Sequence, residues 1–509
     1  MQAHWKVLWW MAAGLVVGLL MQWGLEAPAW SGAGWKATEG RGVELVSAEG
    51  PAAKAQLDVG EAYDRVIVGR GGEEERLVPL STPGDFEEVL EVAENGQVLW
   101  LVRAEDREAT EPVALALGME PDSPRAKWVY WFAFAADIFM ALLKMLIVPL
   151  VMSSIVAGVA SVGALKDLRR LGFKTFAYYG VTSLLAVLLG QLLVNLIRPG
   201  EGAKLGLSAN ANVGERSENF IEILKRMVPE NVPTALTSNG AMLQIIFFAL
   251  LLGYFITRTA EPHSSRIRDL FESFFQVMMR MAEGVLTLLP YGVFALLVKV
   301  VASTGVEPFK ALLLYMLTVA LALVLHAGVV LPLVLKLAGR VNPRAWFRAM
   351  SPALMTAFST SSSSMTLPVT LRTVEERGKV SNKVTSFTLP LGATINMDGT
   401  ALYECIGVIF LAQYYASLGG EPLSLTSQGL VVMMALMASV GAAGIPSAGL
   451  VMMLTILSAL KLPLEGAALL LAVDRPLDMM RTVVNVWSDS CGAAVIGRSE
   501  GEMGALEGG

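Results

Sequence analysis

The segment FSTSSSSMT, residues 358–366, decides the fold. It is rich in serine, yet it interrupts an otherwise apolar segment, residues 345–373, that ends near the basic Arg372. Irregular backbone at membrane depth is tolerated only where protein or a water-filled cavity surrounds it, because lipid offers no hydrogen bonds. We therefore predict the tip of a re-entrant hairpin here, with a flexible surface loop as the alternative.

A second interrupted segment is SVGAAGIPSAG at residues 439–449, with three glycines and a proline inside the apolar residues 425–462. Two such segments in corresponding halves of a membrane region indicate a transporter whose binding site lies near the membrane midplane. We predict a second re-entrant hairpin. The alternative is an ordinary kinked helix, since Gly and Pro are frequent in membrane helices.

Two polar residues lie between these hairpins. The sequence LPLGATINMDGTALYE, residues 389–404, places Asn396 and Asp398 inside an expected helix at residues 383–415. A carboxylate in a membrane segment is costly unless it is paired or binds a cation, so Asp398 is a candidate functional residue. Oxygen ligands from Asn396, Asp398 and nearby carbonyls suit a dehydrated alkali cation. A helix kink with a satisfied polar pair is the alternative.

The last apolar segment, residues 466–498, contains the charged sequence DRPLDMMRTVVNVWSD at residues 474–489. Spacings of four, three and four residues place polar side chains on one helical face: Asp474, Asp478, Arg481 and Asn485, with Thr482 one turn from Asp478. Asp478 can bind an ammonium group, and Arg481 can bind a carboxylate bidentately. The face therefore indicates a zwitterionic solute with an additional carboxylate. A salt bridge that only stabilises the helix is the alternative.

The whole chain has the composition of a polytopic membrane protein. Of its 509 residues, 54% are hydrophobic and 17% are charged, and the mean hydropathy is +0.55, as is typical when lipid is the main solvent. The net charge is −6 and the basic residues form short clusters, so nucleic acid is not an expected partner. Cys405 and Cys491 lack the spacing of a zinc site or a disulfide framework.

Further membrane helices are expected at residues 1–25, 128–162, 172–197, 241–258, 274–303 and 309–338. We interpret the first run as a membrane helix rather than a cleaved signal peptide, because it is long enough to span and no clean cleavage site follows. Alternation places three loops rich in Lys and Arg on one side, which the positive-inside bias makes cytoplasmic. We expect an inner-membrane protein with both termini cytoplasmic and residues 26–127 periplasmic or extracellular.

Residues 26–127 form a soluble insert after the first membrane helix. Its core, about residues 41–118, has the order strand, Gly-Pro turn, short helix, strand, polar turn, helix and strand. It resembles a small α+β fold of the PDZ type, most clearly in GPAAKAQLDVGE at residues 50–61. PDZ folds bind extended peptides at a sheet edge, which implies a peptide or protein partner. A spacer without a ligand stays equally open, because fold does not imply function.

Four ordered motifs, SSSSMTLPVT, NMDGTALYE, GAAGIPSAG and LDMMRTVVNVWSD, resemble those of the dicarboxylate/amino acid:cation symporters, the family of glutamate and aspartate transporters. The resemblance extends to the first two membrane helices through WKVLWWMAAGLVVGLL and LLKMLIVPLVMSSIVAGVAS. It implies an all-α polytopic fold with eight transmembrane helices and two re-entrant hairpins, assembled as a homotrimer in membrane lipid. It also implies a secondary active symporter, not an enzyme, that imports aspartate or glutamate.

The resemblance further implies an elevator-type mechanism. Residues 128–338 would form a fixed scaffold, except that the third and sixth membrane helices join a moving transport core at residues 345–498. This core would comprise hairpins at 345–373 and 425–462 and helices at 383–415 and 466–498. Sodium ions, protons or both are the implied coupling ions, and no other cofactor is expected.

Site residues follow from the matching motif positions. Ser363 and Asn485 would bind the α-carboxylate of the substrate, Asp478 its ammonium group and Arg481 its side-chain carboxylate. Thr400, Gly449 and Thr482 would complete the pocket. The implied sodium ligands form three sets: Gly392, Asn396, Asn485 and Asp489; Thr394 and Ser439; and Tyr179, Thr182, Ser183, Asn396 and Asp398. Met397 lies between the sets and would couple ions to substrate.

The chain departs from the family pattern at two positions. Archaeal members have an arginine just before the three serines of the first hairpin, and animal members have one just after the aspartate that matches Asp478; here these positions are Ser361 and Met479. Arg475 is close in sequence, but we expect it to have a different helical phase. Whether it substitutes for the extra arginine of the family stays open.

Glu404 carries a separate implication. It matches a glutamate that animal members use as a proton carrier, which implies proton coupling through a buried carboxyl group. The alternative is a glutamate that is satisfied by hydrogen bonds and has no role in transport.

Rival functions remain to be separated. A membrane protease is opposed by the residues, because His4, His263 and His326 form no HExxH motif, none lies near the serine cluster, and no GxSxG motif occurs. A channel or passive receptor would not concentrate its solute. Among carriers, C4-dicarboxylates lack the ammonium group that Asp478 would bind, and neutral amino acids would leave Arg481 unpaired.

Overall fold

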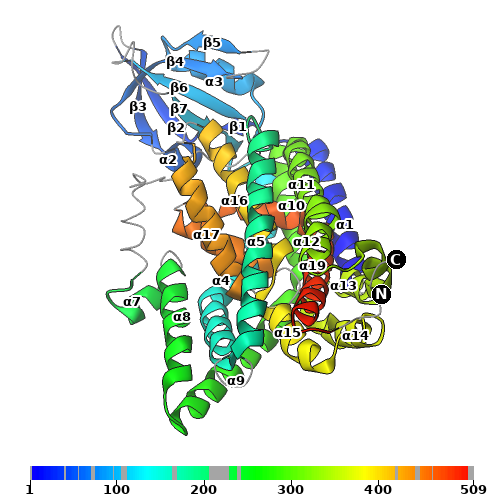
Figure 1. Ribbon diagram of the computed structural model, residues 1–509. Coiled ribbons are helices and arrows are strands. Elements are labelled where there is room, and N and C mark those ends of the chain that lie inside the picture. Colours follow the sequence, from blue (N-terminus) through cyan, green and yellow to red (C-terminus); the bar gives the residue numbers. More distant parts are fainter. Residues whose placement is uncertain are drawn as a thin grey trace.

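The structure, a computed structural model, describes residues 3–38, 42–55, 57–69, 75–95, 97–104, 112–162, 169–203, 205, 228–237, 242–418, 422–441, 448–460 and 462–502. A small part rich in β-strands lies at one end of the molecule, and a larger bundle of helices forms the remainder (Figure 1). The β-rich part is inserted between the first two long helices of the chain.

The first half of the helical part contains α1 (Ala3–Gly24), α4 (Pro124–Val162), α5 (Arg169–Ile197), α7 (Val232–Leu236), α8 (Met242–Arg258), α9 (His263–Leu286), α10 (Leu289–Thr304), α11 (Glu307–Leu325), the π-helix η3 (His326–Val330) and α12 (Leu331–Leu337). The second half contains α13 (Pro343–Thr360), α14 (Ser363–Glu376), α15 (Asn382–Ile395), α16 (Asp398–Ser417), α17 (Leu425–Gly441), α18 (Ala448–Ala459) and α19 (Glu465–Ser499).

Several of these helices are suited to a membrane. Within the described residues, four stretches are long and apolar enough to span it: Pro124–Ala160, Arg170–Ile197, Pro308–Leu337 and Asn382–Ser417. A fifth span results if α9 and α10 count together, although the chain bends by 51° between them. Pro290 in the first turn of α10 favours this break, because proline cannot continue a helix from the preceding turn. The chain is therefore predominantly helical and crosses the membrane several times.

The serine-rich segment joins two helices that pack against each other, α13 and α14. Ser361 ends α13 in a left-handed conformation, with φ of 50°. The Ser362 hydroxyl then accepts a hydrogen bond from the N–H of Met365 and caps α14. Serine favours such caps over helix interiors, so the serine run marks the turn. α17 and α18 also pack against each other, and residues 442–447 of the second expected tip lie outside the described residues.

The chain is also interrupted between α15 and α16. Asn396 ends α15 with φ −91° and ψ 84°, and Met397 precedes α16 with φ −116° and ψ 58°. Neither residue has helical backbone angles. The break places backbone groups and the Asn396 side chain deep in the protein, since both residues are buried.

The insert is built on one antiparallel sheet with the strand order β2-β3-β4-β6-β7, and β5 pairs with β4. Its elements are β1 (Ala29–Trp30), β2 (Ala33–Thr38), β3 (Gly42–Ala48), α2 (Gly50–Lys54), β4 (Ala62–Val68), β5 (Arg76–Pro79), α3 (Pro83–Val92), β6 (Val98–Arg103), β7 (Val113–Ala116) and β8 (Gly118–Met119). The expected order of strands and helices is confirmed by β3, α2, β4, α3 and β6. The other strands were not expected from the sequence, and most of them are short.

Two contacts hold the junctions of the insert together. β1 pairs with β8 and brings the two ends of the insert together. Beyond β8, the guanidinium group of Arg125 donates to the carbonyl oxygens of Leu25 at 2.9 and 2.6 Å and of Gln22 at 2.6 Å. The last carbonyls of a helix lack partners within the helix, so Arg125 caps the end of α1.

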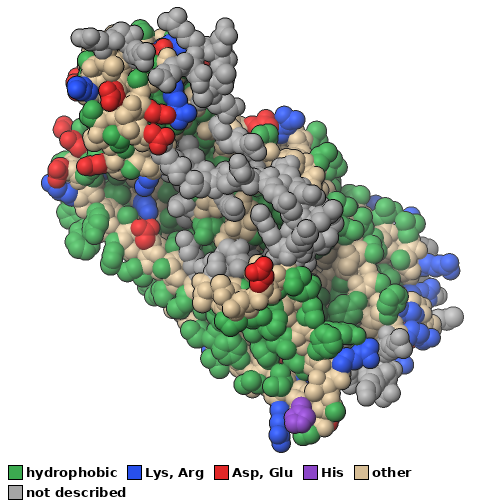
Figure 2. Space-filling model, turned by 90° about the vertical axis from the view of Figure 1, so that its left-hand side faces the viewer, with side chains coloured by type: hydrophobic (Ala, Val, Ile, Leu, Met, Phe, Trp, Pro, Cys, Tyr) green, Lys and Arg blue, Asp and Glu red, His purple; other side chains and the backbone are tan. Residues whose placement is uncertain are grey.

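The surface agrees with a membrane setting. Hydrophobic side chains form broad patches on the helical part, whereas acidic side chains gather mainly on the insert (Figure 2). Among the exposed apolar side chains are Trp128, Trp131, Leu192, Leu196 and Leu317. A soluble protein rarely exposes large apolar patches, so this face is expected to contact lipid or other subunits.

Arg125→Ala should lower the thermal unfolding midpoint of the full chain in detergent, measured by tryptophan fluorescence. Loss of charge-assisted hydrogen bonds should cost about 2 kcal/mol. Arg125→Lys keeps one charged donor and should lose less. Identical midpoints for the alanine variant and the parent chain would show that this cap contributes nothing.

Candidate functional site

The charged residues of α19 meet inside the helical part. Arg481 is only 1% exposed, and its Nη2 atom donates to Asp478 Oδ1 at 2.7 Å and lies 3.2 Å from Asp474 Oδ1. Arg475 Nη1 donates to Asp478 Oδ2 at 3.3 Å. The expectation that Asp474, Asp478 and Arg481 share one face is therefore confirmed. Arg475 reaches the same carboxylate, so the inference that it has a different helical phase was wrong, because three-residue spacing shares a face.

Other helices enclose the Arg481 side chain. Its guanidinium carbon lies 3.9 Å from the centre of the Tyr403 ring on α16, a cation–π contact. A Cβ atom added to Gly449 on α18 would overlap Arg481 Nη1 and lie 3.2 Å from Thr400 Cγ2. Only glycine permits this close approach. The structure thus brings together Thr400, Gly449, Asp478 and Arg481 from three helices.

Arg481 retains unused hydrogen-bonding capacity. Within the described part of the chain, its buried Nε and Nη1 atoms have no hydrogen-bond partner. A buried donor left unpaired costs about 1–3 kcal/mol. The guanidinium group is therefore prepared to bind an anionic group that is not part of the described protein.

Asn485 and Thr482 lie on the following turn of α19. Asn485 accepts from the backbone N–H of Gly399 at 2.8 Å and donates to Thr400 Oγ1 at 3.2 Å. The Thr482 hydroxyl donates to the carbonyl of Asp478 at 2.9 Å. Ser363, the first residue of α14, is buried, and both α13 and α14 pack against α19. Among the described residues, no hydrogen bond or ion pair joins Ser363 directly to Arg481.

A second polar cluster surrounds Asp398, which is fully buried. Its Oδ1 atom accepts from Ser183 at 2.6 Å and from Thr182 at 3.4 Å. Its Oδ2 atom accepts from Ser488 at 2.7 Å and lies 3.1 Å from His326 Nε2. Because α5, η3, α16 and α19 each contribute a side chain, packing of the whole bundle fixes this site.

The helix break adds Asn396 to this cluster. Asn396 Nδ2 donates to Asp489 Oδ1 at 2.8 Å and to Ser488 Oγ at 3.0 Å. Asn396 Oδ1 is buried and has no hydrogen-bond partner within the described residues. An oxygen in that position beside two carboxylates is a suitable ligand for an alkali cation. A Cβ atom at Gly392 would overlap Asp489 Oδ1, so glycine is needed here.

The hydroxyls of three further predicted ligands donate to backbone carbonyls. Tyr179 donates to the carbonyl of Thr388 at 2.7 Å, and its hydroxyl oxygen lies 2.7 Å from the position that a Cβ atom of Gly392 would take, beside Asp489 Oδ1. Thr394 and Ser439 each donate to carbonyls of their own helix, at Leu391 and Leu436 respectively. Met397 is buried at the break between α15 and α16.

Glu404 is also fully buried, and neither of its carboxyl oxygens has a hydrogen-bond partner within the described residues. The described residues therefore do not support the alternative that Glu404 is satisfied by hydrogen bonds and has only a structural role.

Sequence reasoning missed three residues of these clusters: His326, Tyr403 and Ser488. His326 was considered only as a protease residue, although a histidine inside an apolar run is a signal of function or pairing. It begins a π-helix, a feature that often occurs at functional sites. Ser488 lies inside the quoted motif but carries no charge, and the position of Tyr403 under Arg481 depends on how α16 and α19 pack.

Comparisons with known proteins give a consistent result. The model of the sodium:dicarboxylate symporter family matches residues 113–499. Excitatory amino acid transporter 3 of Mus musculus is 35% identical over 418 residues, covering 72% of this chain and 79% of that protein. Excitatory amino acid transporter 4 of Mus musculus is 34% identical over 455 residues, with coverages of 75% and 80%. The proton/glutamate-aspartate symporter of Escherichia coli (strain K12) is 34% identical over 376 residues, with coverages of 72% and 84%.

Ser488→Ala should weaken cation binding to the purified chain by roughly ten- to a hundredfold, because it removes a hydrogen bond to a charged carboxylate worth about 1.5–3 kcal/mol. Binding of radioactive sodium is the measurement. Ser490→Ala is the control: that buried serine donates to the carbonyl of Trp487 and does not contact the cluster. Equal effects of the two substitutions would contradict the assignment.

Proposed function

We propose, from the premise that the chain belongs to the sodium:dicarboxylate symporter family, that it imports aspartate or glutamate by secondary active symport. It is a membrane transporter and not an enzyme. The observation that carries the proposal is the buried guanidinium of Arg481, which has two unpaired donors and an acidic partner beside it.

The charges around Arg481 support an acidic amino acid as substrate. Asp478 would bind the ammonium group, and Arg481 would bind the side-chain carboxylate. These two groups bind each other at 2.7 Å, so a zwitterion that binds to both must replace that bond with two of its own. An acidic amino acid carries both the ammonium group and the side-chain carboxylate. A C4-dicarboxylate lacks the ammonium group, and a neutral amino acid lacks the side-chain carboxylate. Five further residues would complete the pocket: Ser363, Thr400, Gly449, Thr482 and Asn485.

The cluster around Asp398 and Asn396 supports a cation as the coupling solute. We propose sodium ligands among Tyr179, Thr182, Ser183, Gly392, Thr394, Asn396, Asp398, Ser439, Asn485 and Asp489, with Met397 between the ion and substrate sites. The polar cluster and the pocket share α19 and the break before α16. Binding of a cation would therefore fix the same helices that bind the substrate, which is the physical basis of coupling.

Protons are a second candidate coupling ion, carried by Glu404. Its carboxyl group is buried without a hydrogen-bond partner among the described residues, and it lies close enough to Arg481 for their charges to interact. Deprotonation there would place a carboxylate in a poorly solvated position beside the substrate site. The named relatives include a proton/glutamate-aspartate symporter, which is consistent with this role.

The contacts between helices support an elevator-type movement. One group consists of α1, α4, α8, α9 and α10, and another of α5, η3 and α11–α19; the packing within each group is extensive. A cavity of about 470 Å³ lies between them, with Val159 and Leu250 on one side and Tyr179, Ile395 and Leu436 on the other. We propose that the first group is the scaffold and that the second moves along it as a rigid body.

The finer topology belongs to the same proposal. The chain would have eight transmembrane helices and two re-entrant hairpins, α13–α14 and α17–α18, with residues 345–498 as the core of the moving part. Three such chains would form the transporter, with both termini cytoplasmic and the insert outside. The basic loops before α5, α9 and α13 support this orientation through the positive-inside bias.

We propose a separate role for the insert as a PDZ-like module that binds an extended peptide. Among the described strands, β2 is at the edge of the sheet and pairs only with β3. α3 lies next to it, with Phe86 against the Trp35 ring of β2 at 5.0 Å between ring centres. A peptide strand added to β2 would continue the sheet beside α3, as in β-augmentation.

Arg481→Thr should abolish uptake of acidic amino acids and admit neutral ones, because the carboxylate partner is lost and a small polar cavity replaces it. Arg481→Lys keeps the charge but loses the planar fork, and affinity for aspartate should fall by roughly ten- to a hundredfold. Uptake of radiolabelled aspartate and serine into proteoliposomes measures both. Unchanged aspartate affinity in Arg481→Thr would remove the substrate assignment.

Glu404→Gln should flatten the pH dependence of uptake, because glutamine mimics the protonated carboxyl group and cannot release a proton. The measurement is initial uptake rate across acidic to mildly alkaline external pH. Glu376→Gln is a matched control, since Glu376 is exposed and pairs with Arg372. A pH profile of Glu404→Gln identical to that of the control would count against a proton role.

Replacement of residues 33–116 by a short Gly-Ser linker should leave uptake per molecule within about twofold, because β1 and β8 already hold the two junctions together. Uptake and size-exclusion profile are measured together. Complete loss of uptake in a chain that still folds would place the insert in the transport machinery.

A further inference from the structure

A large groove runs along the outside of α11, η3, α12 and the start of α13, with Trp487 of α19 at its inner wall. Its volume is about 1160 Å³. The proposed substrate and cation sites do not include any of the residues that line it. Small-molecule pockets usually have roughly 300–1,000 Å³, so the groove is large for a free inorganic anion.

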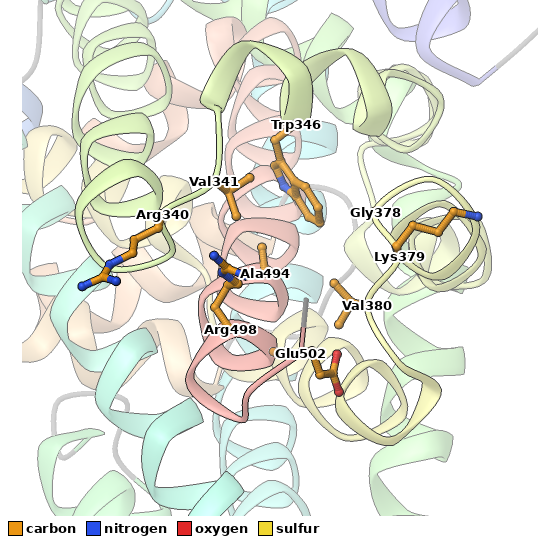
Figure 3. Close-up of a pocket in the computed structure, with 10 residues that line it drawn as sticks. Arg340, Val341, Trp346, Gly378, Lys379, Val380, Ala494, Arg498 and Glu502 are labelled. Atoms are coloured by element: carbon orange, nitrogen blue, oxygen red, sulfur yellow. The ribbon is translucent and has the colours of Figure 1, made fainter. Parts of the chain in front are cut away.

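One end of the groove is strongly basic. Lys336, Arg340, Arg344 and Arg348 line it, and no acidic side chain does. All four are exposed, and none forms an ion pair in the part of the chain that the structure describes. Arg340 also borders a small neighbouring cavity under Trp346, but its side chain extends away from that cavity (Figure 3).

The start of α13 adds to this positive charge. Asn342 and Pro343 line the groove, and the positive end of the helix dipole lies there. Basic side chains in the first turn of a helix are unfavourable unless an anion neutralises them. Arg344 lies in that turn and Arg348 one turn further. The positive charge of this end of the groove therefore favours an anionic group.

The remainder of the groove is apolar. Val324, Phe347 and Pro332 line it together with the wall formed by Ala327, Gly328 and Trp487. Phe347 is 54% exposed, and the adjacent Leu333 and Leu337 on α12 are 53% and 70% exposed. A free anion would gain nothing from this surface, whereas the acyl chain of a lipid would pack along it through van der Waals contacts.

We propose that this groove binds an anionic glycerophospholipid, with the headgroup phosphate on Lys336, Arg340, Arg344 and Arg348 and an acyl chain along α11 and α12. Basic pockets between membrane helices on the cytoplasmic side are suited to such headgroups. The proposal rests on the place of the chain in a membrane and on the orientation of its basic loops, and not on the identity of the transported solute.

The inner wall of the groove links the lipid to the cation cluster. Trp487 Nε1 donates to the carbonyl of Ala327 at 3.1 Å. Ala327 follows His326, and Trp487 precedes Ser488, so the two residues that contact Asp398 Oδ2 are each one position from this wall. A lipid in the groove would pack against the outside of the helix pair that holds Asp398.

The test is lipid binding to the purified full-length chain in detergent, measured by native mass spectrometry. The probes are phosphatidylglycerol, phosphatidylcholine with the same acyl chains, and inorganic phosphate as competitor. Phosphatidylglycerol should bind at least tenfold more tightly than phosphatidylcholine, and inorganic phosphate should not displace it. Each basic residue should contribute about fivefold, so Arg340→Gln/Arg344→Gln/Arg348→Gln should weaken binding by roughly a hundredfold.

Two further variants separate a built groove from general surface charge. Arg258→Gln/Arg266→Gln/Arg268→Gln removes three charges from another basic loop and should change binding by less than about threefold. Arg340→Lys/Arg344→Lys/Arg348→Lys keeps the charge and should retain most of the binding, which keeps the test valid if the glutamine variant misfolds. Equal losses in the two glutamine variants, equal binding of the two lipids, or displacement by inorganic phosphate would each overturn the proposal.

Discussion

The structure depends on the burial of Arg481. An isolated charge in a membrane protein interior is costly, and it is tolerated only when partners surround it. Here Asp478 and Asp474 supply the opposite charge, the Tyr403 ring lies under the guanidinium group, and Gly449 leaves it room. These partners come from α16, α18 and α19. One buried side chain therefore requires α16, α18 and α19, which come from different parts of the sequence, to meet at a single place.

The proposed cation cluster is a near neighbour of this site. Asn485 binds the backbone N–H of Gly399, the residue after Asp398, and Asn396 binds Asp489, one turn beyond Asn485 on α19. A shift of α19 against the helix break would disturb both sites at once. We regard this shared framework as the physical reason that cation and substrate binding would depend on each other, since coupling needs groups common to both sites.

Much of this arrangement could be predicted from the sequence. The four-three-four spacing of Asp474, Asp478, Arg481 and Asn485 defines a helical face, and the serine run at residues 359–364 marks a turn, because both follow from local geometry. Contacts between distant segments could not be predicted in this way. His326 and Asp398 are 72 residues apart, and their pairing depends on the π-helix and on how it packs against α16. The short strands of the insert have no recognisable alternation of apolar and polar residues. The contact between Arg475 and Asp478 was missed, although a spacing of three residues along a helix allows it.

The central claim is that opposite charges buried on α19 bind an acidic amino acid whose entry is driven by a cation gradient. The most direct test is uptake of radiolabelled aspartate by the purified chain in proteoliposomes, with a sodium gradient or a proton gradient imposed in turn. The account predicts accumulation above the external concentration under at least one gradient, and collapse of that accumulation when the gradient is dissipated. Uptake that only equilibrates, and that is indifferent to both gradients, would contradict it.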